Sequence, residues 1–228
     1  MAISSTNHPQ VRSSGIIEKA LLLCGAGYGV VYIIVNDAIA ASIYDGYSRI
    51  DQAVSELSAV GAPPQQFLRW MLPVFTVLMA SFAIGVWKAV GDTTPGKILA
   101  GTIAAFAITG LLWLPFPMTS RGDLAAGINH GGDLGHLVLS GVSVGLFLLQ
   151  FAVGAWLVRG WFAIYSLVSL AVCLGAGAVV AAMASRLPAG EPTPYMGLAE
   201  RVNLGTWLLW MAVLGIVLLR PAADRHSS

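Results

Sequence analysis

Charged residues are scarce in this sequence: 12 basic and 11 acidic side chains make up 10% of its 228 residues. A soluble domain carries about 25% charged residues, so this chain has too few to cover a water-exposed surface. The two signs nearly cancel, at a net charge of +1, which excludes a basic nucleic-acid-binding protein. Only two cysteines are present, Cys24 and Cys173, both in apolar runs, which excludes a disulfide scaffold. Phosphate-loop and dinucleotide-binding fingerprints are absent, as is the His-Glu-x-x-His motif of zinc proteases.

Apolar residues are abundant instead, at 57% of the chain, and they gather in six continuous runs. A bilayer-spanning helix needs about 20 mostly apolar residues and satisfies its own backbone amides in lipid. We therefore predict an all-α, polytopic six-helix membrane bundle in a single domain, residues 1–228, with spans at 17–40, 67–90, 97–114, 134–157, 161–184 and 202–219. An alternative for the first run is a cleaved signal peptide with Ala38-Ile39-Ala40 as its cleavage site, although the run is longer than a usual signal core.

The basic residues are unevenly divided between the two sides of the predicted bundle. The side of the termini holds seven basic and three acidic residues: Arg12, Lys19, Lys88, Lys97, Arg159, Arg220 and Arg225 with Glu18, Asp92 and Asp224. The other side holds five arginines and eight acids: Arg49, Arg69, Arg121, Arg186 and Arg201 with Asp37, Asp45, Asp51, Glu56, Asp123, Asp133, Glu191 and Glu200. Because basic residues favour the cytoplasmic side, we predict a multi-pass protein of the inner (plasma) membrane with both termini cytoplasmic.

The predicted connections also differ between the two sides. Those near 91–96 and 158–160 are very short, whereas those at 42–66, 115–133 and 185–201 are long and lie on the outer side. Loops carry function more often than the scaffold beneath them, so we expect the functional residues at the outer membrane–water boundary.

Glycine is frequent, with 26 residues, many of them inside the spans. The pairs Gly25/Gly29, Gly141/Gly145 and Gly177/Ala181 have the small-xxx-small spacing that lets helices approach closely. This spacing fits packing within one bundle, and it also fits homo-oligomer contacts through glycine-rich helix faces.

The first outer loop predicts a short helix that covers the bundle. Ile50, Val54 and Leu57 fall at helical spacing, Ser48 precedes them as an N-cap, and a proline pair follows. The helix is either a structural lid or the cover of a pocket into which Ser55 and Glu56 face.

Three ionisable residues lie at the outer ends of the first and last spans. Asp37 is about one turn inside the first span, where a charged group faces a partner or a cavity, and Arg49, Arg69 and Arg201 are its candidate partners. Glu200 and Arg201 precede the last span. As neighbours on a helix they point in different directions, so each needs its own partner; for Arg201 these are Asp37, a lipid phosphate or the membrane interface itself.

The most suggestive polar stretch is His130-Gly-Gly-Asp133-Leu-Gly-His136. Two imidazoles and a carboxylate suit a divalent metal ion such as zinc, but on a continuous helix they would spread over about 120°. The alternative is that Asp133 caps the fourth span while the histidines lie in the interfacial layer. No cofactor is expected, with a divalent metal at His130, Asp133 and His136 as the alternative.

The loop 48–63, Ser-Arg-Ile-Asp-Gln-Ala-Val-Ser-Glu-Leu-Ser-Ala-Val-Gly-Ala-Pro, together with Gly-Leu-Ala-Glu-Arg-Val-Asn at 197–203 and the six spans, resembles a prokaryotic six-pass membrane family catalogued as domain of unknown function nine-nine-eight. The resemblance implies a fold over nearly the whole chain and little chemistry. More remotely, the Ser-Glu-x-x-x-x-Gly-x-Pro pattern is similar to one in eukaryotic six-pass proteins linked to autophagy and lipid remodelling.

Three functions remain open on the sequence. The first is binding of a lipid or small amphiphile in a cavity at the outer face, with Asp37, Glu56, His136 and Arg201 as polar contacts. The second is a membrane-embedded, metal-assisted or serine hydrolase, the latter joining Ser55 or Ser120 to a histidine and an acid. The third is a structural subunit of a membrane complex. The expected partners are membrane lipids and a second copy of the chain, and no nucleic acid.

Overall fold

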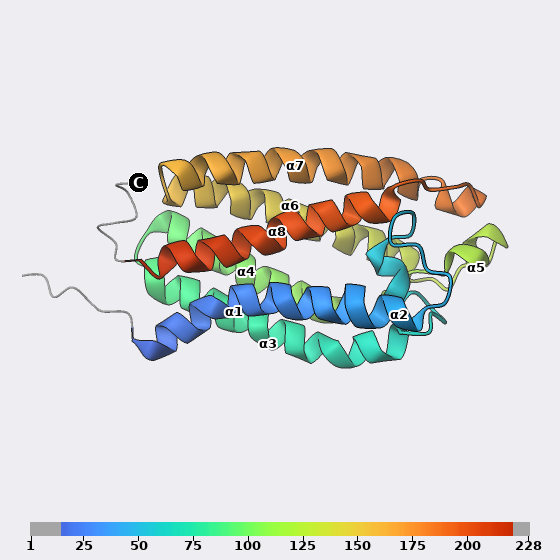
Figure 1. The fold of residues 1–228 in the computed structure, drawn as a ribbon, viewed down its shortest axis with the longest axis horizontal. Coiled ribbons are helices and arrows are strands. Elements are labelled where there is room, and N and C mark those ends of the chain that lie inside the picture. Colours follow the sequence, from blue (N-terminus) through green and yellow to red (C-terminus); the bar gives the residue numbers. More distant parts are fainter. Residues whose placement is uncertain (1–14, 221–228) are drawn as a thin grey trace, which may run out of the picture.

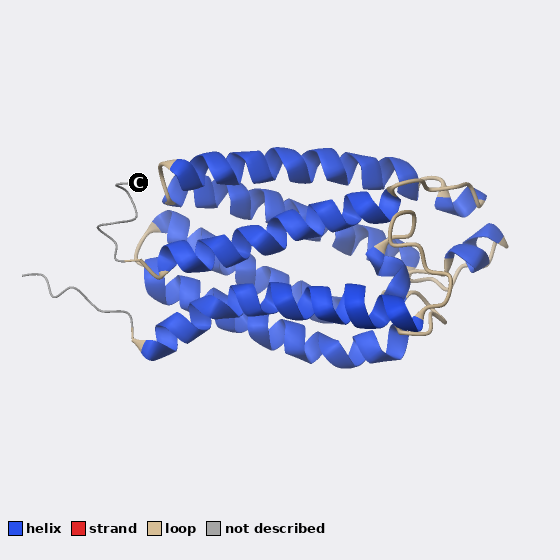
Figure 2. Ribbon diagram, viewed as in Figure 1, coloured by secondary structure: helices blue, strands red, loops and turns tan. Residues whose placement is uncertain are grey.

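The computed structural model describes residues 15–220, in which six helices are long and apolar enough to cross a membrane (Figure 2). They are α1 (Ile16–Ile33), which continues through the π-helical η1 (Ile34–Ala40) and α2 (Ala41–Ile43), then α3 (Gln65–Val90), α4 (Thr94–Leu112), α6 (Asp133–Leu157), α7 (Trp161–Ala184) and α8 (Met196–Leu218). Three short elements complete the described chain: η2 (Val54–Ser58), α5 (Arg121–Ala125) and η3 (Leu187–Ala189). The predicted all-α fold with six membrane-type helices is confirmed. Arg12, Asp224 and Arg225 of the charge comparison lie outside the described residues.

The six long helices alternate in direction (Figure 1), and their contacts form a closed ring. The neighbours are α1 and α3, α3 and α4, α4 and α6, α6 and α7, α7 and α8, and finally α8 and α1. Helix α1 therefore begins, and α8 ends, at the same end of the bundle, here called the terminal end. The opposite end carries three long loops, residues 44–64, 113–132 and 185–195, here called the cap.

Helix α8 provides most of the buried hydrogen bonds that join the helices. The indole of Trp207 donates to Oε1 of Gln150 on α6 at 2.7 Å and stacks on Phe147 at 4.1 Å. The indole of Trp210 donates to Ser166 on α7 at 2.9 Å. Both tryptophans are buried, and lipid offers their N–H groups no acceptor, so these bonds fix α8 against two neighbours.

Glycines close the ring where α1 lies between α3 and α8. A Cβ on Gly85 of α3 would lie 2.9 Å from the backbone of Leu21 and Leu22, and a Cβ on Gly215 of α8 would lie 2.6 Å from the Leu22 carbonyl oxygen. Only glycine lets three backbones approach this closely. Of the predicted small-residue pairs, Gly25 contacts Phe82 inside the bundle, whereas a Cβ on Gly141 would meet nothing within 4 Å.

Exposed tryptophans mark both ends of the bundle. Trp87, Trp156 and Trp161 lie at the terminal end, and Trp70 lies at the cap end, each of them 42–70% exposed. Tryptophan is enriched at both membrane–water interfaces, so these rings bracket the segment that lies in the bilayer.

Two sequence predictions were wrong in their boundaries. The last span begins at Met196, not at 202, so Glu200 and Arg201 lie in the first turns of α8 rather than before it. The predicted helix over the first loop is only the 3₁₀ turn η2, with Val54 and Leu57 buried as expected but Ile50 52% exposed. Side chains bind the loop carbonyls: Tyr47 donates to the oxygens of residues 52 and 53, which removes those acceptors from a continuing helix.

Candidate functional site

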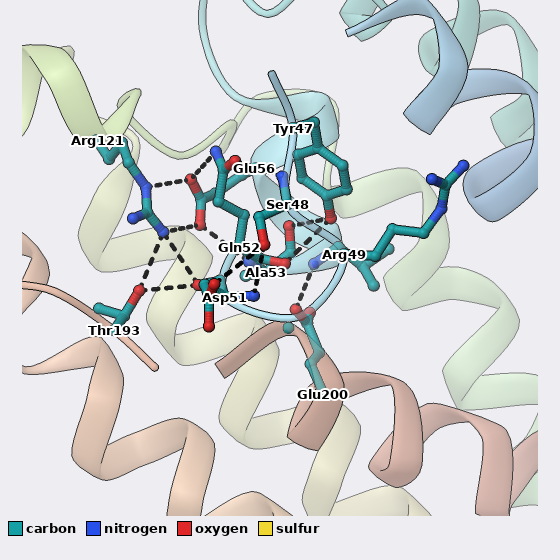
Figure 3. A network of polar contacts seen from close by, with 12 residues as sticks. Tyr47, Ser48, Arg49, Asp51, Gln52, Ala53, Glu56, Arg121, Thr193 and Glu200 are labelled. Atoms are coloured by element: carbon teal, nitrogen blue, oxygen red, sulfur yellow. Dashed lines mark hydrogen bonds and ion pairs between the residues drawn. The ribbon is translucent and has the colours of Figure 1, made fainter. Parts of the chain in front are cut away.

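The cap is held together around the carboxylate of Glu56, which is only 2% exposed (Figure 3). Arg121, which begins α5 in the second loop, donates to both of its oxygens, from Nε and from Nη2, at 2.7 Å each. The backbone N–H of Ala53 and the Gln52 amide donate to the same carboxylate at 2.9 and 3.2 Å. The hydrogen bonds to Glu56 raise the pKa of Arg121, so this residue stays charged. The pair fastens the second loop to the first.

The third loop joins the same network through Thr193. Its hydroxyl donates to the backbone oxygen of Asp51 at 2.9 Å and accepts from Arg121 Nη2 at 3.1 Å. The backbone N–H of Tyr195 donates to the Asp51 carboxylate at 3.1 Å. All three loops of the cap are thus bound to one another, as the sticks in Figure 3 show around Asp51 and Glu56.

A second ion pair ties the first span to the last. Arg201 Nε lies 2.7 Å from Oδ1 of Asp37, a residue of η1, and Nη1 donates to the carbonyl oxygen of Arg49 at 2.8 Å. Arg201 Nη2 also donates to the hydroxyl of Tyr47 at 3.1 Å. Burial raises the pKa of Tyr47 to about 12, so the phenol remains a hydrogen-bond donor at neutral pH.

Glu200 and Arg201 bind different partners, as predicted for neighbours on a helix. At a distance of 2.5 Å, Oε2 of Glu200 accepts a hydrogen bond from the backbone N–H of Val54, the first residue of η2 (Figure 3). The backbone of Gly197 lies against the same loop, because a Cβ there would overlap the Gln52 carbonyl oxygen. The first loop therefore packs on the first two turns of α8.

The histidine-rich stretch does not converge on one point. Asp133 accepts from both N and Oγ1 of Thr119 at 2.7 Å, and the helix cap is Gly132 rather than Asp133. His136 Nδ1 lies 3.2 Å from the carbonyl oxygen of Phe116. His130 pairs with Asp123 at 3.1 Å, and this hydrogen bond, with one from a serine, lowers the pKa of Asp123.

The other hydrolytic candidates are also engaged in local contacts. Ser120 Oγ accepts from the backbone N–H of Asp123 as the N-cap of α5. Ser55 is part of η2, with no side-chain bond to a histidine among the described residues. Within residues 15–220, no three His, Cys, Asp or Glu side chains gather as a metal site would require.

One serine motif was missed on the sequence. Gly-Val-Ser-Val-Gly at 141–145 has the Gly-x-Ser-x-Gly form, but it lies in the middle of α6, where Ser143 is 7% exposed. The nucleophile elbow of hydrolases needs a strand-to-helix turn, and this continuous helix offers none. Ser143 is therefore a buried helix residue.

The sequence did not single out Arg121, Thr193, Tyr47 or Thr119, which bind the predicted residues. Arg121 is 65 residues from Glu56, and Thr193 is 142 residues from Asp51. No periodicity relates residues so far apart. The sequence relates these residues in one way: they all lie in the acidic, arginine-containing loops on the same side of the bundle.

The described surface also has a groove of about 420 Å³ between α7 and α8, at their cap ends. It is lined by Val172, Gly175, Ala176 and Val179 from α7, by Leu198, Ala199 and Val202 from α8, and by Tyr195, the N-cap residue of α8. Except for Ala176 and Ala199 these residues are exposed, so the groove faces outward, toward the hydrocarbon of a membrane. The groove begins at the cap end and its lining is apolar apart from the Tyr195 hydroxyl.

A family model described as "Protein of unknown function (DUF998)" matches residues 26–217. No curated protein and no solved structure matches the chain.

Proposed function

We propose that this chain, which belongs to the DUF998 family of proteins of unknown function, binds a lipid or similar amphiphile at the cap end, with an acyl chain in the groove between α7 and α8. The groove is the observation that carries the proposal. It is apolar, it faces outward, and it adjoins the polar cap, which is the arrangement that an amphiphile requires.

The depth of the groove supports an acyl chain of one leaflet. Val172, its deepest residue on α7, is 12 residues before Ala184, where the helix ends at the cap. At 1.5 Å per residue this is about 18 Å, close to half of a hydrocarbon core about 30 Å thick. The groove thus extends from about the middle of the bilayer toward the headgroup region, and its α7 lining, residues 172–179, covers about 10 Å of that distance.

Small residues make room for the chain. A Cβ on Gly175 would meet nothing within 4 Å, and Ala176 and Ala199 line the groove from the two helices. An acyl chain makes similar dispersion contacts in bulk lipid and against a protein surface. A lipid therefore stays at one site longer than elsewhere only where a preformed groove fits its chain.

The charged residues at the cap end act on this site by positioning its lining and not by contact with the ligand. Asp37, Glu56, Glu200 and Arg201 are bound to one another or to the first loop, and together they fix the first turns of α8. Those turns contribute Tyr195, Leu198 and Ala199 to the groove. We place the cap on the outer side of the inner membrane, because basic residues favour the terminal end.

Filling the groove tests the proposal. Membranes containing a phospholipid with a photoactivatable acyl chain are irradiated, and the labelled peptides of the purified protein are identified. We expect labelling to concentrate on residues 172–179 and 198–202, and Gly175→Leu to reduce it several-fold. Gly141→Leu is the matched control, because that glycine is also exposed, helical and free of neighbours within 4 Å. Equal labelling of all lipid-facing helices, or no difference between the two variants, would overturn the proposal.

A further inference from the structure

We infer that the amphiphile is a phospholipid whose phosphate binds Arg186 at the mouth of the groove; this rests on the proposed function above. The five arginines at the cap end differ in their contacts. Four have side-chain partners: Arg49 binds the Asp37 carbonyl, Arg69 the Leu114 carbonyl, Arg121 Glu56, and Arg201 Asp37. Within residues 15–220, the Arg186 side chain has no hydrogen bond or ion pair, and it is exposed.

The backbone puts Arg186 in line with the groove. Ser185 (φ −63°, ψ −16°) and Arg186 (φ −87°, ψ −21°) keep right-handed helical dihedrals beyond the end of α7. Arg186 follows Val179 by seven residues, and at 100° per residue this is within about 20° of two full turns. Its Cα therefore extends the stripe formed by Val172, Gly175, Ala176 and Val179, about 10 Å nearer the cap.

Tyr195 completes the mouth from the other helix. It lines the groove, is 63% exposed and is the one non-glycine residue in the described chain with positive φ, at 62°. Its backbone N–H donates to Asp51, so the cap network fixes the main chain from which the ring projects. A phenol at the interface is an additional donor for a headgroup oxygen.

A free guanidinium above an apolar groove suits a phosphate. Arginine presents a planar fork of donors that matches phosphate oxygens, and such charge-assisted hydrogen bonds are the strong ones. Glu191 is the only acid of the third loop, and it donates its backbone N–H to the Arg186 oxygen rather than pairing with the side chain. The cation is thus available at the level where lipid phosphates lie.

Two lipids with the same acyl chains, one with and one without a phosphate-containing headgroup, test the inference. Purified protein in detergent is offered phosphatidylglycerol or diacylglycerol with identical acyl chains, and the bound lipid is counted by native mass spectrometry. We expect about tenfold preference for phosphatidylglycerol, the size of one or two hydrogen bonds to a charged group. Arg186→Gln should abolish the preference, and Arg186→Lys should restore part of it.

The controls separate this inference from the proposed function. Arg69→Gln removes another exposed cap-end arginine, whose side chain donates to the Leu114 carbonyl oxygen at 3.4 Å, and should keep the preference. Equal binding of both lipids by the parent protein, or equal losses in the two variants, would overturn the role of Arg186. Competition by glycerol phosphate as strong as that by the whole lipid would do the same, since it would indicate a soluble-anion site. In Arg186→Gln, photolabelling of residues 172–179 should persist. If these residues are not labelled in the parent protein, the proposed binding of an acyl chain in the groove is refuted.

Discussion

The ion pair of Glu56 and Arg121 should stabilise the cap more than any other single contact. Removal of either partner should lower the free energy of unfolding, but by different amounts. The Glu56 side chain is 2% exposed, whereas that of Arg121 is 33% exposed. In Arg121→Gln, a buried carboxylate loses two of its four donors, which should cost about 3–5 kcal/mol. In Glu56→Gln, water can solvate the freed guanidinium, so the expected cost is about 2–3 kcal/mol.

Reversible unfolding in mixed micelles, followed by tryptophan fluorescence, measures both costs. The double variant Glu56→Gln/Arg121→Gln should be less destabilised than the sum, with a coupling of about 2–3 kcal/mol. Because Glu56 raises the pKa of Arg121, the stabilisation is present below the ordinary arginine pKa and is lost only at strongly alkaline pH. The coupling should therefore be constant between about pH 6 and 9. Asp123→Asn, in an exposed pair, is the control and should change little.

Two results would refute this reasoning. A coupling below about 0.5 kcal/mol would mean that the bidentate pair adds little beyond an exposed ion pair. A larger cost for Glu56→Gln than for Arg121→Gln would mean that burial of the carboxylate does not decide the balance.

Two further predictions concern α8. Gly197→Ala should destabilise the protein by at least about 2 kcal/mol and expose the first loop to proteolysis, because the new methyl would overlap the Gln52 carbonyl oxygen; Gly205→Ala, on the same helix with open space around it, should be neutral or stabilising. Trp207→Phe should cost about 1–3 kcal/mol in thermal unfolding because it leaves the buried Gln150 oxygen without its donor, and adding Gln150→Leu should recover part of that cost. A double variant less stable than Trp207→Phe alone would contradict the second prediction.

The sequence predicted the transmembrane part of the fold because long apolar runs have few alternatives in a bilayer. The same criterion misplaced the start of α8, since Glu200 and Arg201 lower the hydropathy of turns that are nevertheless helical. Their charges are compensated by Val54 and Asp37, which are distant in the chain. A hydropathy average over neighbouring residues does not take such distant partners into account.

The cap was the part least accessible from the sequence. Helical spacing of Ile50, Val54 and Leu57 predicted a helix, but hydrogen bonds from Tyr47 and Thr193 to loop carbonyls favour a turn instead. Tyr47 acts within its own loop, whereas Thr193 comes from the third loop, so the effect of Thr193 becomes visible only when the ring of helices brings the loops together.

Closure of the ring between α1 and α8 has a consequence for biosynthesis. Asp37 is synthesised 164 residues before Arg201, its ion-pair partner. At about 5–20 residues per second, the first span spends roughly 8–33 s with an uncompensated carboxylate near the membrane surface. During that interval Glu200 is also missing, so the first loop lacks the helix turns on which it packs. The bundle can close only when its last helix has been made, and a truncation before Glu200 leaves both the ring and the cap unfinished.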